Sequence, residues 1–205
     1  MGTSLLSVEG LQKRYHRGRF SRQVAFSLHA QFRVDAPAVI GVMGPNGSGK
    51  TTLFELITGS NAPTAGRVCV AGQDIHRVRY RERGRLAVHY HQSYQVRAIR
   101  RSVPSFLLAR AAIERPLVHL FDEPQFNTQD GYIGFMLDFF RRLRAEGRVV
   151  FLCLHPTETY HLEILREVCE RFIFVRAGAL TLADDFASLV RDEHVRGYLG
   201  ALAPQ

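Results

Sequence analysis

Cysteine is scarce in this chain and gives no sign of cross-links. The 205 residues include three cysteines, Cys69, Cys153 and Cys169, which lie far apart inside apolar runs. An odd number at such spacings indicates neither a disulfide framework nor a CxxC metal site. A reducing cytosol is the compartment that fits this pattern best.

Long hydrophobic segments are also lacking. The N-terminal sequence MGTSLLSVEG has no basic segment followed by a long apolar stretch, so it does not have the pattern of a secretory signal. The longest apolar runs, such as residues 149–154, are far too short to cross a bilayer. We therefore expect any membrane contact to be made through a partner or through the protein surface.

Acidic residues are outnumbered by basic ones. Lys and Arg number 27 against 19 Asp and Glu, which gives a formal net charge of +8. Such an excess attracts anionic membranes, nucleic acid or polyphosphate ligands without choosing among them, and it serves equally as a solubilising surface. Because no RNA- or DNA-binding module with interleaved aromatic residues is evident, nucleic acid is an unfavoured partner.

The distribution of apolar residues predicts one α/β domain. A chain of 205 residues with 46% hydrophobic residues can bury one substantial core. Alternating patterns at residues 5–8 and 23–34 predict an antiparallel edge sheet, with residues 11–22 as a basic connecting loop around Tyr15. Strands and helices are expected to alternate along the rest of the chain, which implies a largely parallel sheet. The expected strands are 39–43, 66–70, 86–90, 117–121, 149–154, 172–175 and 179–182, and the expected helices are 52–58, 106–114, 133–145, 157–170 and 186–195.

Residues 44–51 read GPNGSGKT, a complete P-loop pattern between a predicted strand and a predicted helix. Glycines at these spacings let backbone N–H groups turn toward phosphate oxygens, and the helix N-terminus adds positive potential. In this arrangement Lys50 reaches the outer phosphates and Thr51 holds Mg²⁺. The strand and helix on either side argue against a coincidental glycine-rich turn. The expected phosphate-binding residues are Gly44, Pro45, Asn46, Gly47, Ser48, Gly49, Lys50, Thr51 and Thr52.

Two carboxylates end the predicted strand at residues 117–121. The sequence there continues as Asp122-Glu123-Pro124, which places both acids at the carboxyl edge of the sheet. An Asp-Glu pair after a strand is often only a turn signal, but an upstream P-loop favours a catalytic pair. We expect Asp122 to bind Mg²⁺ through water and Glu123 to polarise the attacking water as general base.

These two motifs, GPNGSGKT at residues 44–51 and PLVHLFDEP at residues 116–124, resemble those of ATP-binding cassette (ABC) ATPases. The resemblance implies a P-loop NTPase (RecA-like) core with a small antiparallel β subdomain, and ATP with Mg²⁺ as ligands. It also implies that Tyr15 stacks on adenine, that Gln92 senses Mg²⁺ and the γ-phosphate, and that His155 is the switch histidine. Each of the three is, taken singly, as compatible with an ordinary loop, surface or strand-end residue. The implied catalytic set is Lys50, Gln92, Glu123 and His155, and the implied Mg²⁺ set is Thr51, Gln92 and Asp122.

The C-terminal sequences CERFIFVRAG and ASLVRDEHVRGYLG, at residues 169–178 and 187–200, are similar to one subgroup of this family. That subgroup powers lipopolysaccharide export and branched-chain amino-acid uptake. The similarity suggests an envelope-lipid or small-solute transport complex.

The sequence departs from the family between Gln92 and Asp122. No LSGGQ-like signature is present, and the interior of the helical subdomain is missing between residues 103 and 108. We therefore expect residues 1–205 to form a single nucleotide-binding domain with a truncated helical subdomain. Since each ATP in ABC dimers lies between one P-loop and the partner's signature, the isolated chain is expected to bind Mg-ATP and to hydrolyse it very slowly.

Two functions from different classes follow from these patterns. The first is an ABC-type ATPase subunit at the cytoplasmic membrane, held there by an integral permease and completed by a second, signature-bearing ATPase subunit. The second is a nucleotide-dependent regulatory or scaffold module with little or no hydrolysis. The arginines Arg97, Arg100 and Arg101 form either a docking surface for an acidic partner or anionic lipid, or a solvated charge run.

Overall fold

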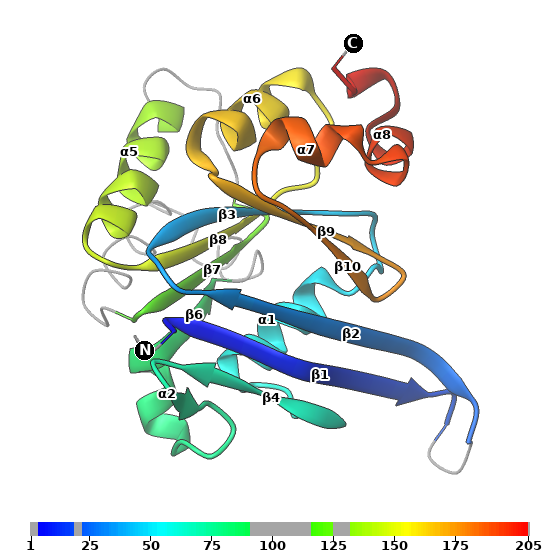
Figure 1. Ribbon diagram of the computed structural model, residues 1–205, viewed down its shortest axis with the longest axis vertical. Coiled ribbons are helices and arrows are strands. Elements are labelled where there is room, and N and C mark those ends of the chain that lie inside the picture. The colour runs from blue at the N-terminus through cyan, green and yellow to red at the C-terminus, as the bar shows by residue number, and fades with distance from the viewer. Residues whose placement is uncertain (1–3, 19–21, 91–115, 125–131, 205) are drawn as a thin grey trace, which may run out of the picture.

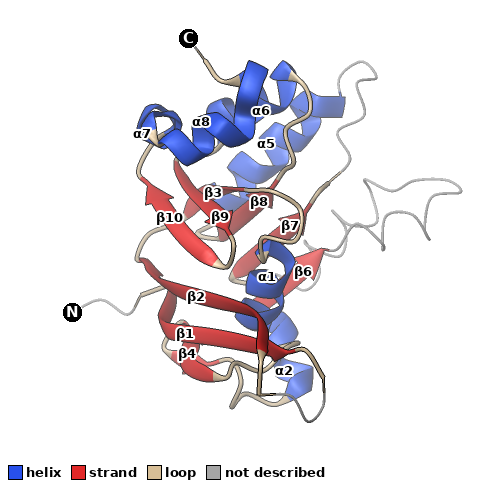
Figure 2. Ribbon diagram, turned by 90° about the vertical axis from the view of Figure 1, so that its right-hand side faces the viewer, coloured by secondary structure: helices blue, strands red, loops and turns tan. Residues whose placement is uncertain are grey.

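A computed structural model gives the structure of residues 4–18, 22–90, 116–124 and 132–204. A six-stranded sheet lies between a layer of helices and a smaller antiparallel sheet (Figures 1 and 2). Its strand order is β10-β9-β3-β8-β7-β6, and every neighbouring pair is parallel except β9 with β10. The predicted α/β fold with a largely parallel sheet is confirmed. The strands are β3 (Ala38–Met43), β6 (Ala87–Tyr90), β7 (Val118–Asp122), β8 (Val149–Cys153), β9 (Arg171–Arg176) and β10 (Ala179–Ala183).

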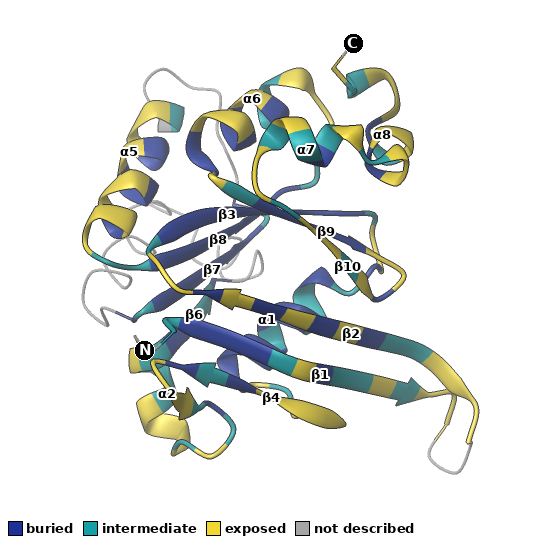
Figure 3. Ribbon diagram, viewed as in Figure 1, coloured by how far each residue is buried: buried dark blue, intermediate teal, exposed yellow. Residues whose placement is uncertain are grey.

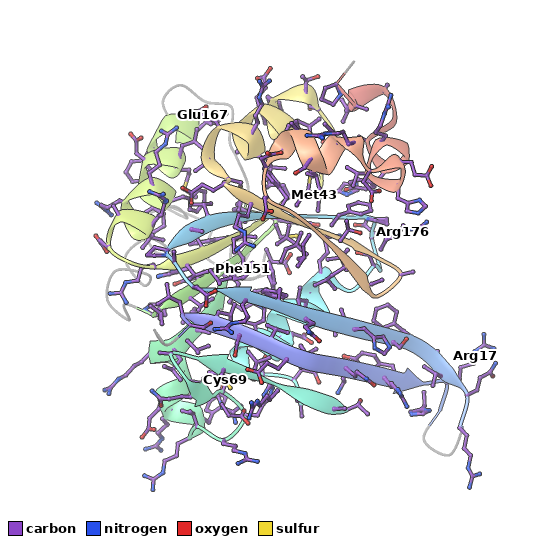
Figure 4. All side chains as sticks on the ribbon, viewed as in Figure 1. Arg17, Met43, Cys69, Phe151, Glu167 and Arg176 are labelled. Atoms are coloured by element: carbon purple, nitrogen blue, oxygen red, sulfur yellow. The ribbon has the colours of Figure 1, made fainter. Side chains whose placement is uncertain are left out.

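Alternate residues of the parallel strands divide between two cores, as the period of a strand requires. In β3, Ile40 and Val42 face the antiparallel sheet, whereas Val39 and Met43 face the helical layer. Burial on both faces explains why β3 and β8 read as continuous apolar runs and colour dark blue in Figure 3. Phe151, labelled in Figure 4, lies in the first core, 6.2 Å from Phe32 and 6.1 Å from Phe54 between ring centroids.

The antiparallel sheet has the order β2-β1-β4-β5 and packs over α1 (Lys50–Thr58). Its strands are β1 (Leu6–His16), β2 (Val24–Val34), β4 (Ala65–Val70) and β5 (Gln73–Asp74). The expected loop at residues 11–22 is wrong over its first part, because β1 continues through Tyr15 to His16. A register shift between Val8 and Leu11 interrupts the alternation of apolar residues, so the second part of this strand did not show in the sequence.

The helical layer comprises α5 (Tyr132–Ala145), α6 (Thr159–Val168), α7 (Phe186–Arg191) and α8 (Glu193–Leu199), with a short 3-10 turn at Gly200–Leu202. The single helix expected at residues 186–195 is two helices. Asp192 has an extended conformation, with φ −66° and ψ 125°, and its carboxylate caps α8 by accepting hydrogen bonds from the N–H groups of His194 and Val195.

The arginine-rich stretch before β6 forms the short helix α2 (Tyr80–Leu86). The helix expected at residues 106–114 lies outside the described residues. No helix in the described ranges is long and apolar enough to cross a membrane.

Candidate nucleotide-binding site

The P-loop follows β3 and leads directly into α1. Lys50 begins the helix, and its ammonium group donates to the carbonyl oxygens of Gly44, at 2.7 Å, and Pro45, at 3.0 Å. The hydroxyl oxygen of Ser48 is buried and has no hydrogen-bond partner among the described residues. A buried cation and an orphaned buried hydroxyl beside a helix N-terminus are the groups that a phosphate would satisfy.

Gly44 and Gly49 are required where the P-loop passes other parts of the chain. Gly44 has φ 147°, and a Cβ there would lie 2.0 Å from the carbonyl oxygen of Val175. Gly49 has φ 112°, and a Cβ there would lie 2.9 Å from the ring of Phe26. A side chain at either position would push the loop away from its neighbours, so the phosphate-binding backbone depends on both glycines.

Asp122 ends β7 and meets the P-loop helix. The hydroxyl of Thr51 donates to Oδ2 of Asp122 at 2.9 Å, and Nε2 of His89 lies 3.2 Å from the same oxygen. Burial raises the pKa of Asp122, but the hydrogen bonds from His89 and Thr51 outweigh it and hold the pKa below its ordinary value of 3.8. Asp122 is therefore an ionised carboxylate at neutral pH.

The donor set fits Mg²⁺. A hydroxyl oxygen and an ionised carboxylate oxygen, from Thr51 and Asp122, stand within hydrogen-bond distance of each other. Oxygen ligands of this kind are those that Mg²⁺ prefers in phosphate sites. Gln92, the third residue expected to bind the metal, lies outside the described residues.

Glu123 turns sharply away from the strand. Its φ of 50° is in the left-handed region, and its N–H donates to the carbonyl oxygen of Cys153 at 3.0 Å. A non-glycine residue in this region is held there at a cost of about 1–2 kcal/mol. The half-buried carboxylate stands next to Asp122 at the carboxyl edge of the sheet, as the sequence predicted.

His155 follows β8 at the same edge. Its Nδ1 lies 2.9 Å from the hydroxyl oxygen of Tyr198 on α8. Strand ends β3, β7 and β8 are neighbours in the sheet, so they bring the P-loop, the Asp122-Glu123 pair and His155 together.

Tyr15 lies on β1 in the antiparallel sheet. Its hydroxyl accepts a hydrogen bond from Asn61 at 2.7 Å, and its ring lies 6.2 Å from that of Phe26, which touches the P-loop at Gly49. The ammonium of Lys13 lies 5.1 Å from the Tyr15 ring centroid. Adenine stacking on Tyr15 stays a prediction.

The sequence did not reveal His89 or Tyr198 as site residues. His89 lies three residues before Gln92 on β6, and alternation along that strand was the one signal that pointed its side chain toward Asp122. Tyr198 came to notice only inside the C-terminal similarity, and nothing in its spacing indicated the P-loop.

Comparison with known proteins agrees with this geometry. Residues 28–102 match the family model described as ABC transporter. Solved structures described as the ATP-binding subunit of an ABC transporter and as a bacterial Atm1-family ABC exporter with ATP bound superpose with TM-scores of 0.69 and 0.73, at 17% identity each. The first superposition covers 98% of this chain and 100% of that chain, and the second covers 100% and 43%. The described residues thus have the fold of an ABC-type ATP-binding domain.

Relatives among curated proteins carry different substrates in their names. The hemin import ATP-binding protein of Pseudomonas entomophila is 38% identical over 81 residues, which are 40% of this chain and 29% of that protein. The methionine import ATP-binding protein of Geobacillus kaustophilus is 26% identical, with 69% of this chain and 55% of that protein covered. The octopine permease ATP-binding protein of Rhizobium meliloti is 25% identical, with 78% and 84% covered. Matched segments of this chain thus span between about a quarter and about half of the length of the first curated relatives that it matches.

Proposed function

We propose that this chain is the ATP-binding subunit of an ABC-type membrane transport or envelope-lipid export complex. The observation that carries the proposal is the hydrogen bond between Thr51 and Asp122, which joins the P-loop to the acidic end of β7. The family match at residues 28–102 includes the whole P-loop. Binding of Mg-ATP at this edge of the sheet is the activity that these side chains support.

Each residue of the site has a distinct task in this proposal. Mg²⁺, when bound, neutralises charge on the phosphates. Lys50 leaves the carbonyls of the loop to bind the outer phosphates, and Thr51 with Asp122 holds the cation. Glu123 accepts a proton from the attacking water, and His155 donates a hydrogen bond to the terminal phosphate. Gln92 adds a ligand that responds to the metal and the γ-phosphate.

Hydrolysis requires a partner in this proposal, because the chain has no LSGGQ-like segment between Gln92 and Asp122. The alignment with the octopine permease protein runs over 224 residues but uses 78% of this 205-residue chain, so that relative has segments without a counterpart here. Segments of a relative that are absent from this chain are what an excised helical subdomain between residues 103 and 108 predicts. Charge stabilisation supplied in trans is worth on the order of 10³ to 10⁵ in the rate of phosphoryl transfer.

The partners follow from the same reasoning. An integral membrane permease would change conformation in response to ATP binding by this chain, and a second ATPase subunit would supply the signature. The chain would then lie peripherally at the cytoplasmic face of the membrane, with anionic lipid as a further contact for its basic surface. The similarity of the C-terminal sequence supports the subgroup of lipopolysaccharide export or branched-chain amino-acid uptake, while relatives named for hemin, methionine and octopine leave the substrate open.

The test compares Mg-ATP binding and turnover of wild type, Lys50→Ala and Glu123→Gln, first alone and then with the subunits that co-purify. We expect wild type and Glu123→Gln to bind Mg-ATP and Lys50→Ala to bind it much more weakly. Turnover is expected from wild type with its partners and from neither Glu123→Gln sample. Failure of the wild type to bind Mg-ATP would contradict the proposal, as would brisk turnover by the isolated chain.

A regulatory or scaffold module is the second candidate, favoured by the missing signature. ATP would then order the loops at Gln92 and His155 without appreciable hydrolysis. Binding without turnover in the complete complex would establish this alternative over the enzyme.

A further inference from the structure

The C-terminal helix α8 contributes a side chain to the candidate nucleotide site. The hydroxyl oxygen of Tyr198 lies 2.9 Å from Nδ1 of His155, and the two ring centroids are 5.9 Å apart. The two residues are 43 positions apart in the sequence. Figure 1 shows α8 above the loop that leads from β3 to α1.

Packing holds Tyr198 in place. Its ring lies 5.5 Å from that of Phe174 on β9, with an angle of 50° between the ring planes. Val195 and Leu199, on the same helix, are buried in the core beneath the helical layer. The cap from Asp192 fixes the start of α8, so the hydroxyl is presented from an anchored element.

The surroundings of Tyr198 keep its hydroxyl protonated. Burial raises the pKa of Tyr198 to about 12, and the negative charge of Glu123 acts in the same direction. The backbone of Gly44 acts in the opposite direction. The neutral phenol is therefore a hydrogen-bond donor at neutral pH.

The direction of the hydrogen bond follows from the partners of the phenol. The neutral phenol has one O–H to donate, and Nδ1 of His155, 2.9 Å from the hydroxyl oxygen, is its acceptor among the described residues. A neutral imidazole that accepts at Nδ1 carries its proton on Nε2. Among the described residues, the His155 ring has no other hydrogen bond, so Nε2–H is the donor that remains to it.

We propose that Tyr198 is a positioning residue that holds His155 in the Nε2–H tautomer and so prepares it to donate to the terminal phosphate of ATP. The proposal rests on the proposed function, because it assigns a phosphate oxygen as the acceptor. In this proposal, helix α8 sets the tautomer of His155 through the Tyr198 hydroxyl.

The first test reads the tautomer without any nucleotide. Nitrogen-15 NMR of the full chain at neutral pH distinguishes a protonated from an unprotonated imidazole nitrogen, and loss of signals in His155→Gln assigns the ring. We expect an unprotonated Nδ1 and a protonated Nε2 in wild type, and a shift toward a mixture in Tyr198→Phe. Tyr160→Phe is the matched control, since it removes the hydroxyl of another half-buried tyrosine, whose ring centroid lies 4.1 Å from that of His161. A protonated Nδ1 in wild type, or an unchanged spectrum in Tyr198→Phe, would overturn the proposal.

The second test reads the consequence for ligand binding. Calorimetric titration compares Mg-ATP with Mg-ADP for wild type, Tyr198→Phe and Tyr160→Phe. We expect Tyr198→Phe to weaken Mg-ATP binding by about 2- to 10-fold, the range of one neutral hydrogen bond, and to leave Mg-ADP binding unchanged. Equal loss for both nucleotides, or no loss, would overturn the role assigned to the terminal phosphate. If wild type bound neither nucleotide, the proposed function would fail, and the imidazole spectrum alone would decide the role of Tyr198.

Discussion

The hydroxyl of Thr51 donates to Oδ2 of Asp122 at 2.9 Å, across 71 positions of the sequence. Thr51 lies in the first turn of α1, and Asp122 is the last residue of β7. Their contact joins α1 to the edge of the sheet at which the P-loop, Glu123 and His155 also lie. The site thus depends on the register of β3, β8 and β7, which no single segment specifies.

Removing the hydroxyl of Thr51 should separate magnesium binding from folding. We expect the free energy of unfolding of Thr51→Val to be about 1 kcal/mol lower than that of wild type, because Oδ2 of Asp122 loses one of its two hydrogen-bond donors. We also expect it to lose most of the difference in ATP affinity between magnesium and EDTA solutions, whereas Thr51→Ser keeps that difference. Calorimetry in the two solutions makes the measurement, and equal behaviour of the Val and Ser variants would contradict the assignment.

The backbone of Glu123 is held in a left-handed conformation that disfavours residues other than glycine. At φ 50° a glycine is more favourable than any L-residue, so Glu123→Gly should be about 1 kcal/mol more stable than Glu123→Ala. Both variants should lack turnover in the assembled complex. Urea unfolding of the two variants provides the comparison, and an alanine variant as stable as the glycine variant would show that the backbone is relaxed.

His119 on β7 should make the protein sensitive to mild acid. Burial, together with the charge of Arg148, lowers the pKa of His119 from 6.5 to about 4, although the backbone carbonyl of Pro116 acts in the opposite direction. Between pH 6.5 and pH 4 the unfolded chain therefore binds a proton at His119 that the folded chain does not bind. The contribution of neutral His119 to the free energy of unfolding is fully present above pH 6.5. It is lost as the pH falls toward 4, and the loss is on the order of 3 kcal/mol.

The matched variant for that measurement is His119→Phe, which keeps an aromatic ring beside Tyr90 and Phe121. Urea unfolding from pH 7 to pH 4 should show a shallower loss of stability in the variant than in wild type. Parallel curves for the two proteins would show that His119 is protonated within the fold.

Gly178 should affect the P-loop from outside it. The N–H of Gly178 donates to the carbonyl oxygen of Ser48 at 2.9 Å, and a Cβ at this position would lie 1.8 Å from the carbonyl oxygen of Ser27. We expect Gly178→Ala to lower the free energy of unfolding by more than about 2 kcal/mol and to weaken ATP binding, since the turn must move off the P-loop. The position also has φ 79°, which disfavours alanine.

Gly134 offers the control for that substitution. It lies within α5, and a Cβ there would have no heavy atom of the described residues within 4 Å. Gly134→Ala should therefore stabilise the protein by about 0.5–1 kcal/mol and leave ATP binding unchanged. Thermal unfolding with and without Mg-ATP tests both glycine variants, and similar effects of the two would contradict the contact with Ser48.

Local sequence patterns predicted the elements of this fold well where burial was simple. Strands covered on both faces, such as β3 and β8, appear as apolar runs, and the P-loop combines turn glycines with a helix start. Prediction was wrong where neighbours decide the conformation. The shift after Val8 disturbs the alternation in β1, and Asp192 divides the last helix by capping its second half.

The sequence by itself determined the P-loop at residues 44–51, the Asp122-Glu123 pair and the parallel α/β class, because these depend on residue types at short spacings. Only the tertiary structure decided that His89 joins Asp122 and that Tyr198 meets His155. Such contacts depend on the order of the strands and on how α8 packs over them. Short-range patterns do not encode that order, since it is set by the burial of two cores at once.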